Sequence, residues 1–172
     1  DWTLGANLGY FIGKEDGAER AGKLDNRTAS AMLSARYQGH TFYVGLQKVS
    51  GDDAWMRVNG TSGGTLANDS YNSSFDNAKE RSWQVRHDFN FATVGVPGLT
   101  LMNRYIKGEN VTVGSVDDGK EWARETELAY VVQSGSLKDL SVKWRNSTMR
   151  RDFSTNAFDE NRLIVSYPLN LL

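Results

Sequence analysis

The stretch SWQVRHDFNF, residues 82–91, alternates strictly between two kinds of side chain. One set of alternate positions is largely apolar: Trp83, Val85, His87, Phe89 and Phe91. The other set is polar or charged: Ser82, Gln84, Arg86, Asp88 and Asn90. A period of two predicts a β-strand with one apolar and one polar face. A barrel with its apolar face in lipid and its polar face around water satisfies both sets.

The same alternation recurs along almost the whole chain and predicts about eight strands. They fall at residues 2–13, 27–37, 41–49, 81–91, 99–107, 121–133, 140–150 and 162–172. Short connections, near residues 38–40, 92–98 and 134–139, alternate with longer ones, near residues 14–26, 50–80, 108–120 and 151–159. Outer-membrane barrels have short periplasmic turns and longer extracellular loops. The sequence therefore predicts an all-β fold, a transmembrane antiparallel β-barrel, in which residues 1–172 form a single segment.

The composition agrees with a barrel and excludes several other classes. No stretch approaches the roughly 18 consecutive apolar residues of a membrane helix, whereas a barrel strand is apolar only at every second position. The formal net charge of -1 gives no indication of a nucleic-acid partner. The chain has no cysteine, so it has neither a disulfide framework nor a cysteine metal site. It opens directly in a strand pattern without a signal peptide, so we expect a processed chain or a fragment.

The strand phase places many charged side chains on the polar face. The interior of an eight-stranded barrel is filled by its own side chains. We expect more cations than acids there, so unpaired cations would have to be hydrated in a lumen of roughly 16–18 strands. We therefore predict that further strands come from residues outside this sequence. The inward cations are Arg36, Arg86, Arg104, Lys143, Arg145 and Arg162, and the inward acids are Asp88, Glu125 and Glu127.

These cations suggest a path for anions. Lys143 and Arg145 are two residues apart, so they share a face at a spacing of about 7 Å. Guanidinium groups bind carboxylates through two parallel hydrogen bonds. Several spaced cations let an anion pass from one to the next without any of them becoming a trap. The alternative is that cations and acids pair across strands and shape the wall, and both can hold together.

The segment 50–80 is too long for a simple hairpin connection. We expect this extracellular loop to fold over or into the mouth of the barrel and narrow it, because it contains side chains that can be buried. The alternative is an exposed surface loop. The candidate buried residues are Trp55, Met56, Leu66, Tyr71 and Phe75.

Signals of catalysis are poor. The two histidines, His40 and His87, have no metal-ligand spacing with another ligand. The glycine pair at 63–64 belongs to no phosphate-binding motif, since no Gly-Lys-Ser/Thr follows it. We therefore predict no enzymatic activity, no catalytic residue, no metal site and no cofactor.

Four stretches, covering together most of the chain, resemble the OprD family of outer-membrane porins, also called outer-membrane carboxylate channels. They are NGTSGGTLANDSYNSSFDNAKERSWQVRHDFNF, GVPGLTLMNRYIKG, EWARETELAYVVQSGSLKDLSVKWRNS and FDENRLIVSYPLNLL. The resemblance implies the C-terminal eight strands of a barrel of roughly 18, with the long loop folded inward. It carries the family's basic ladder onto Lys143, Arg145 and Arg162. The ending Leu171-Leu172 departs from the C-terminal aromatic residue usual for such barrels.

We therefore expect a substrate-selective channel for passive diffusion of small carboxylates across a Gram-negative outer membrane. The resemblance is nearest to the branch that takes up cyclic or aromatic acids such as benzoate. The expected partners are small carboxylates, outer-membrane lipid and the remaining strands of the same barrel. The alternatives are a general porin, a porin selective for basic amino acids, and a small structural barrel of eight strands.

Overall fold

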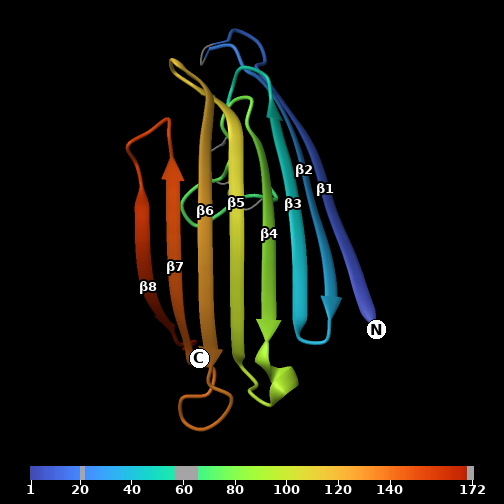
Figure 1. The fold of residues 1–172 in the computed structure, drawn as a ribbon, viewed down its shortest axis with the longest axis vertical. Coiled ribbons are helices and arrows are strands. Elements are labelled where there is room, and N and C mark those ends of the chain that lie inside the picture. Colours follow the sequence, from blue (N-terminus) through green and yellow to red (C-terminus); the bar gives the residue numbers. More distant parts are fainter. Residues whose placement is uncertain (20–21, 57–65, 170–172) are drawn as a thin grey trace.

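The computed structural model describes residues 1–19, 22–56 and 66–169, and these form one antiparallel sheet (Figure 1). Its strands follow the chain in order, so each strand pairs with its sequence neighbours. The strands are β1 (Trp2–Lys14), β2 (Asp25–Tyr37), β3 (His40–Ser50), β4 (Arg81–Asn90), β5 (Leu99–Val113), β6 (Val116–Val131), β7 (Ser141–Arg151) and β8 (Phe158–Ser166). A single 3-10 turn, η1 (Phe91–Val94), joins β4 to β5 in the described chain. The prediction of eight antiparallel strands is confirmed.

The two faces of the sheet differ as period two requires. One face exposes large apolar side chains, and we call it the outward face. Its exposed residues include Leu4, Leu8, Leu33, Val44, Val85, Leu128 and Leu163. The opposite, polar face carries the buried polar residues Ser30, Gln47, Ser82, Gln84, Glu121 and Glu125. Within the described residues, no helix is long and apolar enough to cross a membrane.

The sheet is open, because β1 and β8 are its two edges and do not pair with each other. The start of β1 and the end of β8 lie at the end of the sheet that carries the short connections between β2 and β3 and between β6 and β7 (Figure 1). β1 ends and β2 begins at the other end of the sheet, where β3 also ends and β4 begins (Figure 1). The alternation of short and long connections therefore maps onto the two ends of one sheet.

One predicted loop is wrong. Residues 108–120 continue β5 and β6 as a hairpin that turns only at Gly114 and Ser115. Valines and a threonine at 111–113 favour extended backbone, and Gly114 has the positive φ of 58° that the turn requires. The register shifts between Gly108 and Val113, which indicates a β-bulge. The polar composition of this stretch concealed the strand.

The segment 66–80 crosses the polar face of the sheet, where the green trace runs beside β4 to β6 (Figure 1). Phe75 is fully buried there in a cluster with Ile106, Ala123 and Met149. Leu66 is also buried. The main apolar core of the described chain thus lies between this segment and the polar face.

The earlier part of the same connection is less enclosed. Trp55 packs edge-on against Phe11 of β1, with ring centroids 4.9 Å apart, and is half-buried. Met56 is 41% exposed, so the expectation that it is buried is wrong. It lies beside Gly13 near the end of β1, beyond the part of the sheet that residues 66–80 cover. Residues 57–65, with the glycine pair at 63–64, lie outside the described residues.

Candidate functional site

Two rows of charged residues run across the polar face, because the strand register places them opposite one another. The first row, from β2 to β8, is Arg36, Thr41, Asp88, Met102, Glu127, Arg145 and Arg162. The second row is Ser34, Tyr43, Arg86, Arg104, Glu125, Ser147 and Glu160. All the sequence-predicted site residues except Lys143 lie in these rows, and Lys143 precedes Arg145 by one alternation on β7.

Arg104 is the most enclosed of these cations. Its side chain is 9% exposed, and it forms an ion pair with Glu125, whose side chain is fully buried. One guanidinium nitrogen also donates to the backbone oxygen of Asp69, at 3.0 Å. As the strand phase predicts, Arg104 shares its face with Met102 and Ile106, which are both buried. Arg104 is therefore held by both the sheet and the segment that crosses it.

Tyr71 stands between two arginines. The guanidinium carbon of Arg104 lies 5.1 Å from the centroid of its ring, and that of Arg145 lies 4.3 Å away. The phenol donates to Glu127 at 3.2 Å, and the backbone amide of Tyr71 donates to Glu125 at 2.8 Å. Burial, reinforced by the charge of Glu127, raises the pKa of Tyr71 to about 12, so it remains a neutral donor. Such rings attract cations through their negative faces.

Glu127 serves two cations on β7. The guanidinium of Arg145 forms an ion pair with one of its oxygens, and Nζ of Lys143 lies 4.0 Å from the other. On β8, Nε of Arg162 donates to Glu160 at 2.5 Å. Arg145 and Arg162 are opposite in register, so two arginines occupy neighbouring positions on β7 and β8.

The two remaining cations behave differently from each other. Arg86 forms a two-pronged pair with Asp88, with N···O distances of 2.7 and 2.6 Å, and its guanidinium lies over the ring of Tyr43 at 4.9 Å. Arg36 is exposed and forms no ion pair with any residue among 1–19, 22–56 and 66–169. The first row therefore begins with a solvated guanidinium at β2.

The expectation of several unpaired inward cations is wrong within the described chain, since only Arg36 lacks an acid. Five of the six cations have a carboxylate within ion-pair distance. Two of the pairs join residues two apart on one strand, Arg86 with Asp88 and Arg162 with Glu160. Glu160 is one of the acids of the polar face that the sequence reasoning missed, and Glu121, which pairs with Arg151, is another. The position of Glu160 two residues before Arg162 was the available signal, because such residues share a face of a strand.

Neutral polar groups of β2 to β4 hold the first part of the covering segment. The amide of Ala67 donates to Ser30 Oγ at 2.7 Å, and the amide of Asn68 donates to Gln47 Oε1 at 3.0 Å. The side-chain nitrogen of Gln84 donates to the backbone oxygen of Ala67. These groups are buried or half-buried, and each hydrogen bond satisfies a group that would be costly to leave unpaired.

Carboxylates hold the second part. Ser73 Oγ lies 3.0 Å from Glu121, which also pairs with Arg151 at 2.8 Å. Asn77 donates to Glu80 at 2.7 Å and to Glu121 at 3.2 Å. Burial and the nearby charge of Glu121 raise the pKa of Glu80 to about 8. Glu80 and Glu121 thus lie close together beneath the segment, where Asn77 donates to both of them. Among the described residues, Arg151 is the cation that pairs with Glu121.

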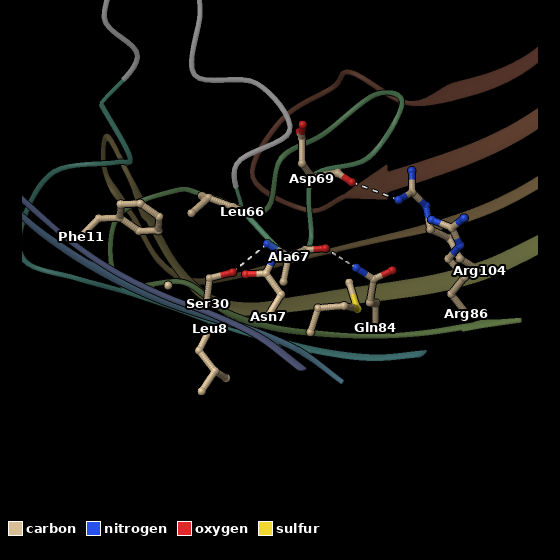
Figure 2. A pocket seen from close by; sticks show the side chains of 12 residues that line it. Asn7, Leu8, Phe11, Ser30, Leu66, Ala67, Asp69, Gln84, Arg86 and Arg104 are labelled. Carbon is tan, nitrogen blue, oxygen red and sulfur yellow. Dashed lines mark hydrogen bonds between the residues drawn. The ribbon is translucent and has the colours of Figure 1, made fainter. Parts of the chain in front are cut away.

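A hollow of about 590 Å³ lies between the first part of the segment and the strands β1, β2, β4 and β5. Figure 2 shows Phe11 and Leu66 at one side of it and Arg86 with Arg104 at the other, while Leu8 points away on the outward face. The hollow therefore offers an apolar region next to two guanidinium groups. Such a pairing fits a molecule with an apolar part and an anionic part.

The chemistry of these residues is anion recognition. Among the described residues, no group of three or more histidine, cysteine or acidic side chains is placed to hold a metal ion. The site combines arginines with carboxylates that an anion would have to displace, and with tyrosine rings that lie against three of those arginines. A sheet that is apolar outside, polar inside and lined with such residues forms part of the wall of a membrane channel.

The chain belongs to the OprD family of outer membrane porins, whose family model matches residues 1–171. The members of this family are channels rather than enzymes, which confirms the expectation that the chain is not an enzyme. The porin-like protein GalP of Pseudomonas putida is 68% identical over the whole chain, which spans 41% of that relative. The family assignment places the chain in the outer membrane.

Solved structures agree closely with the sheet. A BenF-like porin from Pseudomonas fluorescens is 75% identical with a TM-score of 0.97, over 99% of this chain and 44% of that one. OccK2 (OpdF) of Pseudomonas aeruginosa in complex with glucuronate is 67% identical with a TM-score of 0.96, over 100% and 47%. OpdK of the same species with vanillate is 52% identical with a TM-score of 0.94, over 98% and 44%. The eight strands are therefore part of a larger barrel, and the position of this part within the whole remains a prediction.

Proposed function

We propose that this chain supplies part of the wall of an outer-membrane channel through which small carboxylates diffuse. The observation that carries the proposal is the group of Arg104, Tyr71 and Arg145, in which two guanidinium groups face one aromatic ring. A carboxylate can bind the guanidinium groups while an attached ring packs against Tyr71. Cyclic and aromatic carboxylates fit this arrangement best.

The relatives support this class of substrate. Glucuronate and vanillate, the molecules named with OccK2 and OpdK, each carry one carboxylate on a ring. Both relatives share the present fold over nearly the whole chain. A channel that passes such acids by way of several cations needs no bond-breaking residue and no cofactor.

The acids of the site determine how strongly each cation binds an entering carboxylate. Glu127 already occupies Arg145, and Glu160 already occupies Arg162. An entering carboxylate exchanges with these groups, so the net gain at each cation is small. Weak binding at several places in a row permits both entry and exit. Residues 66–80 narrow the passage in this proposal, and Arg36 provides a solvated cation at the edge of the row.

The test is single-channel recording of the full-length porin in a planar bilayer, with and without benzoate. We expect benzoate to perturb the current, and expect at least about a tenfold loss of its apparent affinity in the double variant Arg145→Ala with Arg162→Ala. Benzamide, which has the ring without the charge, should have little effect on either protein.

A matched control replaces two cations of the outward face, Arg124→Ala with Arg150→Ala. It removes the same charge from β6 and β7 and should leave the benzoate effect unchanged. Equal responses of the inward and outward variants would contradict the proposal and favour a general porin whose cations only shape the wall.

A further inference from the structure

The outward face carries a groove across β1 to β4, with Glu109 of β5 also in its lining. It has a volume of about 520 Å³ and is lined mainly by apolar side chains. Ala29 and Ala31 of β2 contribute small side chains to it, and larger ones stand on the neighbouring strands. These larger residues are Leu8, Tyr10, Leu46 and Trp83, all at least 40% exposed. The groove is therefore wide enough for a hydrocarbon chain. It lies on the face of the sheet opposite to the charged residues of the proposed anion path.

Two cations stand at one end of this groove. Lys48 and Arg81 are directly opposite in the register of β3 and β4, and both are exposed. Like charges in opposite positions destabilise a sheet. Neither side chain forms an ion pair with another residue in the part of the chain that the structure describes. Lys48 and Arg81 are thus two adjacent positive charges that form no ion pair among the described residues.

The nearest acid does not remove this charge. Glu109 is opposite Arg81 on β5, but its carboxylate lies 3.7 Å from Nζ of Lys107. The four side chains Lys48, Arg81, Lys107 and Glu109 therefore carry three positive charges and one negative charge. The excess favours an anion at this place.

The cations also lie at a particular level of the outward face. Arg81 precedes Trp83 by one alternation, and the ring of Trp83 lies 5.7 Å from that of Tyr105. Tyrosine and tryptophan gather where the hydrocarbon of a bilayer meets its headgroups. Lys48 and Arg81 are on the loop side of this aromatic level, so they stand at the depth of lipid headgroups.

We propose that the groove is a binding site for a membrane lipid that bears a phosphate. The acyl chain lies over Ala29 and Ala31 between Tyr10 and Trp83, and the phosphate binds Lys48 and Arg81. Arginine binds phosphate through two parallel hydrogen bonds, and lysine adds a point charge. A phospholipid or lipid A has long apolar chains attached to a phosphate. The groove has an apolar part next to two cations, so the lipid and the groove match along their length. Lipid binding on the outward face is independent of what passes through the pore.

The test uses native mass spectrometry of the full-length porin in detergent, titrated with purified lipid A, a phosphorylated glycolipid. We expect one tightly retained lipid A per barrel segment of this kind, and expect roughly a thirtyfold weaker affinity in the double variant Lys48→Gln with Arg81→Gln. The control variant, Lys23→Gln with Lys138→Gln, removes the same charge from exposed connections and should retain the lipid as the unaltered protein does.

Two further arms separate the parts of the proposal. Ala31→Trp fills the groove without changing the charge, and it should lower the affinity for lipid A at least severalfold. Ion conductance of the same variant shows that the barrel is still folded. Inorganic phosphate at millimolar concentration should not displace lipid A. Displacement by phosphate alone would overturn the lipid assignment, and equal retention by the Lys48/Arg81 variant and its control would overturn the site.

Discussion

The segment that crosses the polar face is held in two different ways along its length. Residues 66–68 bind hydroxyl and amide groups of β2 to β4, such as Ser30 and Gln47. Residues 71–77 bind carboxylates of β6, such as Glu121 and Glu125. The neutral groups serve the segment alone, whereas Glu121 and Glu125 are each shared with an arginine. Residues 71–77, and Asp69 through the hydrogen bond that its backbone oxygen accepts from Arg104, are thus coupled to the charges of the path, whereas residues 66–68 are not.

Glu125→Gln is expected to have the largest effect on this comparison. It leaves the nearly buried Arg104 without its counter-charge, a loss of about 3–5 kcal/mol for a buried pair. The amide hydrogens of residues 70–75 should then exchange faster while those of Ala67 and Asn68 change little. Hydrogen exchange of the full-length porin, read by mass spectrometry, measures both parts at once. Uniform loosening of both parts would show that they open together.

The two parts of the segment should also differ in how their attachment to the sheet depends on pH. Glu80 has a pKa raised from its usual value of 4.5 to about 8 by burial and by Glu121. Between those values the folded protein holds a proton that the unfolded chain has released. Attachment of the second part should therefore weaken as pH rises from 4.5 to 8, by about 1.4 kcal/mol per unit at most, and level off above 8.

Glu80→Gln tests this directly, because the amide stays neutral at every pH. Exchange of residues 73–79, corrected for its intrinsic pH dependence, should lose most of its slope in this variant. The groups that face Glu80 are Glu121, Asp76 and Asn77, and Arg151 faces Glu121. Asp152→Asn, at an exposed turn beside Lys120, is the matched acid replacement and should keep the slope.

Gln47→Leu should loosen the segment at Asn68 and at Phe75 by a smaller amount. Its side chain accepts from the amide of Asn68 and donates to the backbone oxygen of Phe75 at 2.7 Å. Unpairing these buried groups costs about 1–3 kcal/mol. The resulting exchange should be independent of pH, in contrast to that of the Glu80 region. A change in benzoate affinity in this variant would contradict the separation of the two parts.

The sequence predicted the strands well and the pairing poorly, for a physical reason. Alternation identifies which face a residue occupies, so Arg104 could be placed inward from its own strand. The choice of partner depends on the register between strands, which alternation does not contain. The sharing of Glu127 between Lys143 and Arg145 follows from such a register. The position of Tyr71 depends on contacts of a long connection with β6, which no local pattern records.

Tyr71 offers the smallest but sharpest comparison, because two substitutions divide its contributions. Tyr71→Phe removes the hydrogen bond to Glu127 and keeps the ring between Arg104 and Arg145. We expect a loss of about 0.5–1.5 kcal/mol in attachment of the second part and little change in benzoate affinity. Tyr71→Leu removes the ring as well and with it the cation–π contacts, worth about 0.5–2 kcal/mol.

Tyr71→Phe and Tyr71→Leu should therefore differ more in the single-channel response to benzoate than in hydrogen exchange. If the ring of Tyr71 helps to bind the ring of a substrate, the Tyr71→Leu substitution should reduce the effect of benzoate severalfold while leaving that of acetate, which has no ring, nearly unchanged. If Tyr71 serves only to hold the arginines, benzoate and acetate should weaken together. The ratio of the two acids separates recognition by the ring from positioning of the charges, even when both variants loosen the segment to the same degree.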